Sequence, residues 1–249
     1  MNQSFFIGAL GAHQQQKSLT VTSNNIANVN SHGYKGQVAR FSHLMYDSLR
    51  AIEQDTVGYG VGTAVWHTDT NFSAGPVADT GRRMDYAIEG SGFFALADLE
   101  SGEISYTRNG AFSWGSLQRD SGLVDENGQP ILEQVYYLSD GEGRMVLGRD
   151  GNMIEMGEDP HAKQDIGVFD FANYNGKEHE NGTRFLPVEK NGGITVGSGK
   201  VIQGVLEMSN VDLANEMVKV IESQRAYSLA LKMMTTSDEI ETSINNLRG

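Results

Sequence analysis

The chain has 249 residues, of which 39% are hydrophobic and none is cysteine, and its formal net charge is −13. Such a length suits one large domain or two small ones. The acidic balance argues against nucleic acid or an anionic membrane as a partner. The lack of thiols excludes disulfides, thiolate metal sites and cysteine nucleophiles. No segment approaches the roughly 20 apolar residues that cross a bilayer, and the N-terminus predicts no cleaved signal peptide.

Charge and composition divide the chain into three regions. The first 50 residues carry +3, residues 206–249 carry −3, and residues 51–205 hold −13. All four prolines and 25 of the 30 glycines lie in the middle region. We therefore expect strands and turns between two helical ends. The expected organisation is a helix and joint at 1–40, an extended connector at 41–83, a β domain at 84–205 and a helix at 206–249.

The N-terminal stretch predicts a helix, from about residue 3, that needs a partner. Phe6, Leu10 and Val21 would line one face, and small residues near the start would allow close approach. The middle of the stretch, HQQQKS, is polar, so this helix would be weak alone.

The segment SNNIANVNSHGYK, residues 23–35, predicts a turn at the end of that helix. Asparagine side chains compete for backbone hydrogen bonds and tolerate the left-handed conformation, and glycine tolerates a positive φ. Tyr34 would anchor the turn, and Lys35 would place a charge near the C-terminal end of the helix. We expect a joint that redirects the chain out of a helical layer. Its residues are Asn24, Asn25, Asn28, Asn30, Gly33, Tyr34 and Lys35.

The middle region predicts an antiparallel β domain. From residue 84 onward, short apolar runs alternate with Glu-Gly, Ser-Gly, Asn-Gly and Asp-Gly turns about ten residues apart, as in antiparallel sheets. Before it, TVGYGVGTAV (residues 56–65) is rich in glycine and β-branched residues and predicts an extended arm. The expected class is α+β, with long terminal helices paired as a coiled-coil-like layer around a central antiparallel β domain.

The C-terminal region carries the strongest local signal. Ser209 and Asp212 predict a capping box for an uninterrupted helix of about 36 residues and about 54 Å. Its apolar positions follow a heptad spacing up to Met234 and then resume on a rotated face. With two N-terminal positions they form the predicted seam. The seam residues are Leu10, Val21, Leu213, Met217, Val220, Gln224, Tyr227, Leu231, Met234, Ile240, Ile244 and Leu247.

A helix with one apolar stripe must bury that stripe against something. Two arrangements are open: a helical hairpin within one monomer, or an interface with other copies of the chain. The phase slip near the end of the seam favours other copies, because one partner helix would not follow both faces.

The sequence shows no recognisable catalytic, cofactor or metal motif. GYGVGT lacks the spacing of a phosphate-binding loop, GSGFF is not a hydrolase elbow, and DENGQP and RDGNMI match only part of a calcium loop. The six histidines are scattered singly: His13, His32, His43, His67, His161 and His179. We therefore expect no enzyme, no cofactor and no metal. The rival classes are a carbohydrate-active domain, with a carboxylate pair within 85–200, and a monomeric binding module.

Four segments together resemble one family. SNNIANVNSHGYK resembles the N-terminal signature of the flagellar axial proteins, which are the rod, hook and hook-filament junction subunits. VLEMSNVDLANEMVKVIESQRAY (205–227) resembles their C-terminal signature, and DYAIEGSGFF (85–94) and YTRNGAFS (106–113) resemble shared segments of their central domain. The length leaves no room for the outer domains of hook proteins, so the chain resembles a rod protein. SGFF and QRAY favour the distal-rod subunit, whereas the short connector between Arg50 and Thr70 leaves a proximal-rod paralogue open.

The resemblance implies a shared plan. The terminal helices would pack with those of neighbouring subunits as the inner layer of a helical tube, the drive shaft that carries motor torque to the hook. The implied partners are copies of the chain, other flagellar rod and hook subunits, the type III export apparatus, and the surrounding bushing rings or peptidoglycan. The implied location is the basal body in the cell envelope, reached through the flagellar channel. We expect both ends to be largely disordered in the free subunit and to become ordered on polymerisation.

Overall fold

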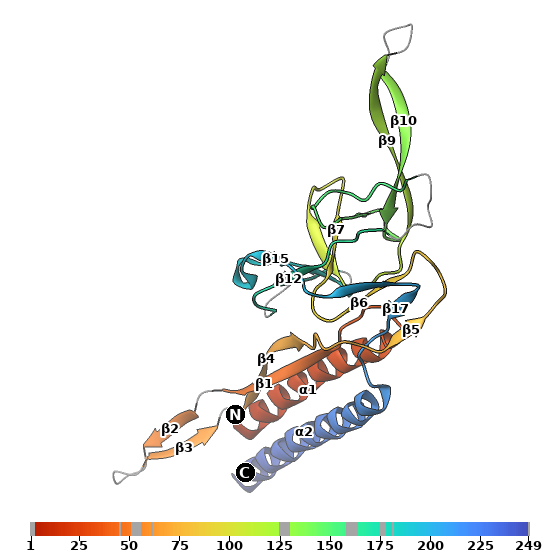
Figure 1. The fold of residues 1–249 in the computed structure, drawn as a ribbon. Helices are drawn as coiled ribbons and strands as arrows, with labels where there is room; N and C mark the ends of the chain where they lie inside the picture. The colour runs from red at the N-terminus through yellow and green to blue at the C-terminus, as the bar shows by residue number, and fades with distance from the viewer. Residues whose placement is uncertain are drawn as a thin grey trace. The chain divides into compact units, whose positions relative to one another are not determined.

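The computed structural model describes residues 3–44, 46–50, 56–60, 62–124, 130–157, 164–174, 178–180 and 182–248. DENGQP (apart from Pro130) and His161 lie outside these ranges. The described residues form two α-helices, one short 3-10 helix and 17 strands (Figure 1). The chain divides into two compact units. Unit 1 comprises Met1–Val29, Gly36–Asn71 and Val211–Gly249, and unit 2 comprises Asn30–Lys35 and Phe72–Asn210.

Unit 1 contains both long helices, α1 (Gln3–Ala27) and α2 (Leu213–Arg248), which pack side by side (Figure 1). The close approach depends on a small residue. A Cβ atom on Gly8 would lie 3.0 Å from Cγ of Met234 and 3.2 Å from the Ala230 carbonyl oxygen. Helix α2 has 36 residues and is therefore about 54 Å long.

The start of α2 differs from the expectation. Asp212 caps the helix, because its Oδ1 accepts hydrogen bonds from the N–H groups of Ala214 at 2.9 Å and Asn215 at 3.4 Å. The predicted capping box with Ser209 at the N-cap is therefore wrong, and the helix begins at Leu213. Leu206 and Glu207, predicted at the start of the C-terminal helix, instead form strand β17 together with Val205, and this strand pairs with β5.

Unit 1 also holds two antiparallel strand pairs. Strand β1 (Gln37–His43) pairs with β4 (Thr63–Thr70), and β2 (Tyr46–Arg50) pairs with β3 (Thr56–Gly60). The first pair lies on α1, where the Val65 N–H donates to Gln14 Oε1 at 2.9 Å.

Unit 2 is built from short antiparallel strands. Its main sheet has seven strands in the order β13-β14-β8-β7-β11-β10-β9, and three two-stranded pairs, β12-β15, β16-β6 and β17-β5, flank it. The strands are β5 (Val77–Asp79), β6 (Tyr86–Glu89), β7 (Phe94–Ala97), β8 (Ile104–Thr107), β9 (Ser113–Val124), β10 (Pro130–Ser139), β11 (Met145–Val146), β12 (Phe169–Phe171), β13 (Glu178–Glu180), β14 (Arg184–Leu186), β15 (Ile194–Val196), β16 (Lys200–Gln203) and β17 (Val205–Glu207). The 3-10 helix η1 spans Glu189–Asn191.

The described core residues of unit 2 form two apolar clusters rich in aromatic rings. The first contains Tyr86, Ile88, Phe94, Leu96, Phe112, Leu138, Val146, Ile166 and Val168. The second contains Phe93, Ala95, Tyr106, Leu147, Phe171 and Phe185. Many of these residues come from the glycine-punctuated runs that predicted strands. The α+β class, with a helix at each end and an antiparallel β region between them, is confirmed.

Candidate functional site

Asn25 joins three elements of unit 1. It lies in the last turn of α1 and is 2% exposed. Its Oδ1 accepts the Gln37 N–H at 2.9 Å, and its Nδ2 donates to the Gln37 carbonyl at 2.7 Å and to Glu216 Oε2 at 3.1 Å. Lys219 also donates to Glu216, at 2.5 Å. One carboxamide therefore ties α1 to the backbone of β1 and to the first turn of α2, which uses both its donor and its acceptor.

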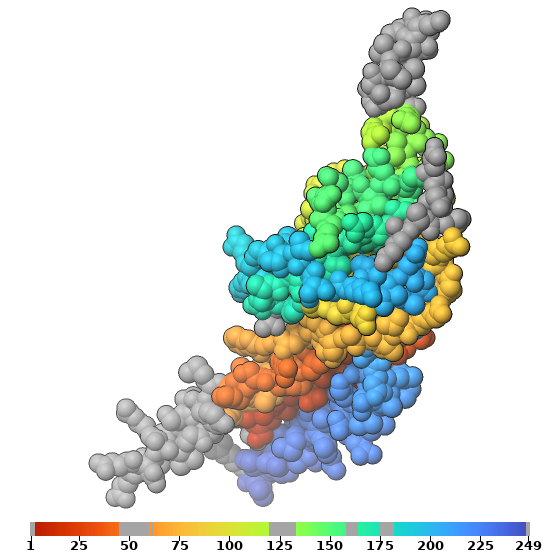
Figure 2. Space-filling view, viewed as in Figure 1, coloured from red at the N-terminus to blue at the C-terminus, as the bar shows by residue number. Residues whose placement is uncertain are grey.

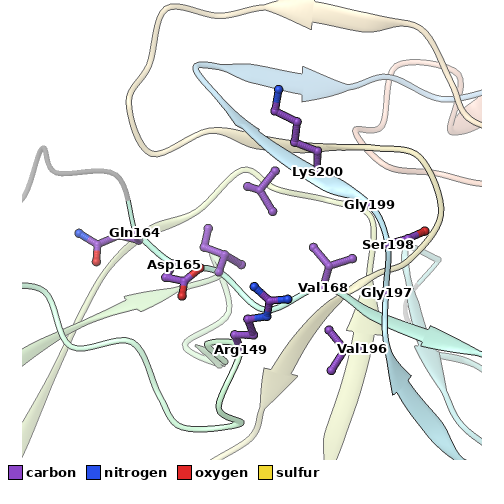
Figure 3. A pocket seen from close by; sticks show the side chains of 11 residues that line it. Arg149, Gln164, Asp165, Val168, Val196, Gly197, Ser198, Gly199 and Lys200 are labelled. Atoms are coloured by element: carbon purple, nitrogen blue, oxygen red, sulfur yellow. The ribbon is translucent and has the colours of Figure 1, made fainter.

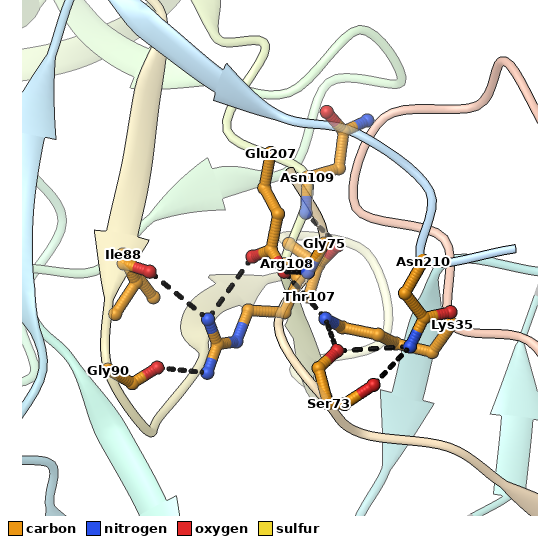
Figure 4. A network of polar contacts seen from close by, with 10 residues as sticks. All are labelled: Lys35, Ser73, Gly75, Ile88, Gly90, Thr107, Arg108, Asn109, Glu207 and Asn210. Atoms are coloured by element: carbon orange, nitrogen blue, oxygen red, sulfur yellow. Dashed lines mark hydrogen bonds and ion pairs between the residues drawn. The ribbon is translucent and has the colours of Figure 1, made fainter. Parts of the chain in front are cut away.

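Lys35, Arg108 and Glu207 form a buried charged cluster in unit 2, which we call the Glu207 cluster (Figure 4). Lys35 Nζ lies 2.6 Å from Glu207 Oε1 and donates to the Ser73 carbonyl at 2.7 Å. The lysine and glutamate side chains are 0% and 2% exposed.

The second oxygen of Glu207 contacts Arg108, whose NH1 lies 3.1 Å from Oε2. The guanidinium also donates to the carbonyls of Ile88 at 3.3 Å and Gly90 at 2.7 Å. The Gly75 N–H donates to Glu207 Oε1 at 2.9 Å. One carboxylate thus holds the end of the joint, the segment 73–75 and the segment after β8 against β17 (Figure 4).

The electrostatics of this cluster fit a structural role. Burial lowers the pKa of the Lys35 ammonium below its ordinary value, and the Glu207 carboxylate opposes that shift. Two cations and one anion leave an excess positive charge, which the three carbonyl groups help to disperse. Because Lys35 and Glu207 are sealed from solvent, a substrate would not reach them. Removing one partner of such a cluster is strongly destabilising.

Gly33 fits against the backbone next to Arg108. Its φ is +68°, and a Cβ atom there would lie 2.3 Å from the Asn109 nitrogen. Its N–H donates to the Glu207 carbonyl oxygen at 2.8 Å. Tyr34 is fully buried beside it. Only glycine meets both the left-handed conformation and the close approach.

The predicted joint residues lie in different surroundings. Asn25 lies in unit 1, whereas Gly33, Tyr34 and Lys35 lie in unit 2. Asn28 Nδ2 donates to the carbonyl and the side-chain oxygen of Asn24 at the helix end, at 2.9 and 3.0 Å. Asn30 is exposed. Lys35 was expected to place its charge near the C-terminal end of the helix, and in unit 2 its ammonium pairs with Glu207.

Sequence reasoning missed the partners Arg108, Glu207 and Glu216. Each lies inside a segment that resembles a family signature, and Glu207 directly follows the buried Leu206. The signal that the sequence offered for Glu207 was a charged residue next to the apolar positions of a strand. Its partner could not be identified, because Lys35 and Glu207 are 172 positions apart.

Little of the predicted seam faces α1. The fully buried positions of α2 are Glu216, Ser223 and Ser237, and its half-buried ones are Val220, Ala226, Ala230 and Met234. Leu10, Val21, Val220 and Met234 are therefore the half-buried members of the predicted seam. The remaining members are exposed: Leu213, Met217, Gln224, Tyr227, Leu231, Ile240, Ile244 and Leu247. Figure 2 shows the surface of α2, in blue, open along the helix on the face that is drawn.

In a cavity of about 340 Å³ in unit 2, the described lining residues form no recognisable catalytic arrangement (Figure 3). Among the described residues that line it, the titratable ones are Arg149, Asp165 and Lys200, so these residues supply one carboxylate and not the pair that glycoside hydrolysis usually needs. Across the described residues, no three His, Cys, Asp or Glu side chains are grouped as a metal ion would require. Neither described helix carries a stretch apolar and long enough to cross a membrane.

Three family models match separate parts of the chain. They are described as "Flagella basal body rod protein" over residues 7–35, "Flagellar hook protein FlgE/F/G D1 domain" over 87–155, and "Flagellar basal body rod FlgEFG protein C-terminal" over 202–247. Lys35, Arg108 and Glu207 each come from a different one of these segments. The Glu207 cluster thus joins all three matched regions.

Full-length relatives carry related names. The chain is 33% identical to the flagellar basal-body rod protein FlgG of Buchnera aphidicola subsp. Schizaphis graminum, over 99% of this chain and 100% of the relative. It is 30% identical to FlgG of Bacillus subtilis, over the whole of both chains. It is also 30% identical to the flagellar basal-body rod protein FlgF of Caulobacter vibrioides, over 98% of this chain and 96% of the relative.

Proposed function

Because the chain belongs to the flagellar basal-body rod protein family, we propose that it polymerises, with copies of itself and with other rod and hook subunits, into the drive shaft that transmits motor torque to the hook. The observation that carries the proposal is the apolar surface of α2. Met217 is 53% exposed and Leu231 is 39% exposed in the single subunit. Large apolar side chains along one long helix indicate a surface meant for burial.

The proposed seam supplies the apolar burial that the contact between α1 and α2 lacks. Most of the buried and half-buried positions of α2 are serine, alanine or glutamate, so the contact with α1 gains little from the hydrophobic effect. Holding 36 residues in one helix costs backbone entropy at every position. Burial of the exposed seam residues against neighbouring subunits would offset that cost. We therefore propose that ordering of the terminal helices and assembly are coupled.

We propose separate roles for the remaining predicted features. The joint residues would fix how the chain leaves α1, through the Asn25 contacts in unit 1 and the Glu207 cluster in unit 2. The export apparatus and the surrounding rings or peptidoglycan are proposed as partners on family membership alone, as is export without a cleaved signal peptide. No catalytic role is proposed.

The experiment compares polymers formed by two single-residue variants. Leu231→Asp places a charge where the packed layer would exclude water, which is costly. Purified wild-type protein is expected to form rods that pellet and are visible by negative-stain microscopy. The Leu231→Asp protein is expected to stay soluble with unchanged unfolding, because the side chain is already part-exposed. Lys232→Asp, at the next position, is the control and should still polymerise.

Two results would contradict this account in different ways. Normal rods from Leu231→Asp would show that the proposed face is wrong. A wild-type chain that never forms rods, at any concentration or with any related subunit, would contradict the polymerising role itself.

A further inference from the structure

Trp66 lies on the surface of unit 1, at an irregularity in the pairing of two strands. In the ladder of β1 and β4, Arg40 pairs with His67 and the next residue, Phe41, pairs with Val65. Trp66 is therefore the extra residue of a β-bulge, a feature that re-aims side chains. The indole is 75% exposed. Tryptophan is a frequent energetic anchor of protein interfaces because it buries a large ring and offers one N–H donor.

A cavity on the helix pair of the same unit has matching chemistry. It measures about 410 Å³, and its lining residues are Gln15, Gln16, Leu19, Gln224, Tyr227 and Ser228. Leu19 and Tyr227 provide apolar and aromatic walls. The three glutamine carboxamides provide oxygen acceptors within a neutral lining. An amphipathic indole suits this lining better than a charged or a purely aliphatic side chain.

Trp66 and the cavity lie on different sides of α1. Gln14 accepts the Val65 N–H and thereby marks the side of α1 that β4 covers. Gln16 lines the cavity. At about 100° per residue, Gln16 lies about 200° around the helix axis from Gln14, and the other lining residues of α1, Leu19 and Gln15, lie about 140° and about 100° from it. The indole on β4 and the cavity are thus separate surface patches, so a contact between them joins two different molecules.

We infer that Trp66 of one subunit inserts between α1 and α2 of a second copy of this chain, in the cavity lined by Leu19 and Tyr227. The inference rests on the proposed function and names one contact within the polymer. Because the two patches differ, the contact is head-to-tail. A head-to-tail contact that does not close into a ring extends into an open helical filament.

The first test uses the fluorescence of Trp66. The chain has two tryptophans, so Trp114→Phe leaves Trp66 as the only indole. On polymerisation its emission should shift to shorter wavelength, and its quenching by acrylamide should fall severalfold. The matched variant, Trp66→Phe, retains only Trp114, so its emission controls for changes that are not specific to Trp66. A polymer in which Trp66 stays as quenchable as in the free subunit would overturn the inference while leaving the proposed function intact. Absence of any polymer would overturn both.

The second test uses the absence of cysteine from the chain. A double variant, His67→Cys with Gln16→Cys, places one thiol beside the indole and one at the cavity. A bis-maleimide linker added to the polymer should give a ladder of dimers, trimers and higher species. Adding Trp66→Ala should remove the ladder. Cross-linking that stops at dimers, or polymers that give no cross-links, would overturn the head-to-tail contact.

Discussion

Gly33 and Gly102 have nearly the same backbone conformation in very different surroundings. Their φ values are +68° and +70°. A Cβ atom on Gly102 would meet nothing within 4 Å, whereas one on Gly33 would lie 2.3 Å from the Asn109 nitrogen and 2.5 Å from the Arg108 carbonyl carbon. Both glycines belong to unit 2. Substitutions at these two glycines therefore separate the free-energy cost of a left-handed residue from the free-energy cost of a backbone clash.

We predict that Gly33→Ala destabilises unit 2 far more than Gly102→Ala does. The alanine at Gly102 should cost about 1–2 kcal/mol, the strain of a left-handed L-residue. At Gly33 the methyl group must also displace the backbone that carries Arg108. Urea unfolding of the two purified variants measures the difference. Equal losses of unfolding free energy would mean that the close approach at Gly33 carries no cost.

The sequence predicts the local property of Gly33 but not its surroundings. A glycine after an asparagine-rich helix end indicates a positive φ, because that property belongs to the residue itself. The contact with Asn109 depends on a chain segment 76 positions away. The same limit explains why Lys35 was expected near the helix end, although burial places it against Glu207.

At the scale of elements, the Glu207 carboxylate connects β17 with three other segments of unit 2. Glu207→Gln keeps the shape of the side chain but leaves the cations of Lys35 and Arg108 without their anion. We predict a loss of about 3–5 kcal/mol in the unfolding free energy, as for other broken buried ion pairs. Chemical denaturation followed by near-ultraviolet circular dichroism measures it.

The matched control is Glu155→Gln, in the same unit. Glu155 lies 2.5 Å from Arg119, but both side chains are about half exposed, so its loss should cost about 0–1 kcal/mol. If Glu207→Gln and Glu155→Gln lower the unfolding free energy by the same amount, burial of the Glu207 cluster adds no extra stability.

The elements themselves were largely predictable, but the way the helices face each other was not. Heptad spacing identifies α2 because apolar residues recur along it. The contact with α1 instead uses small and polar positions such as Ser223 and Ala230, which a search for apolar residues passes over. Close packing at Gly8 makes small residues suitable there. A single sequence shows which stripe is apolar, but not which partner covers it.

At the scale of the whole molecule, the two stripes of α2 imply that folding and assembly depend on each other. One stripe packs against α1 through small and polar residues. The other stripe is exposed and includes Ile240, Ile244 and Leu247. The last turns therefore have few intramolecular apolar contacts to hold them. Unit 2, with its two aromatic clusters, has a core of its own. We expect unit 2 to fold in the free subunit and α2 to be stabilised by neighbours.

Amide hydrogen exchange along α2, in the free subunit and in the polymer, tests this account most directly. In the free subunit we predict fast exchange across Leu213–Arg248 and slow exchange in the strands of unit 2. In the polymer, α2 should become protected along its whole length. A free subunit with α2 already protected to the level of the unit 2 core, and no further protection on polymerisation, would contradict the account.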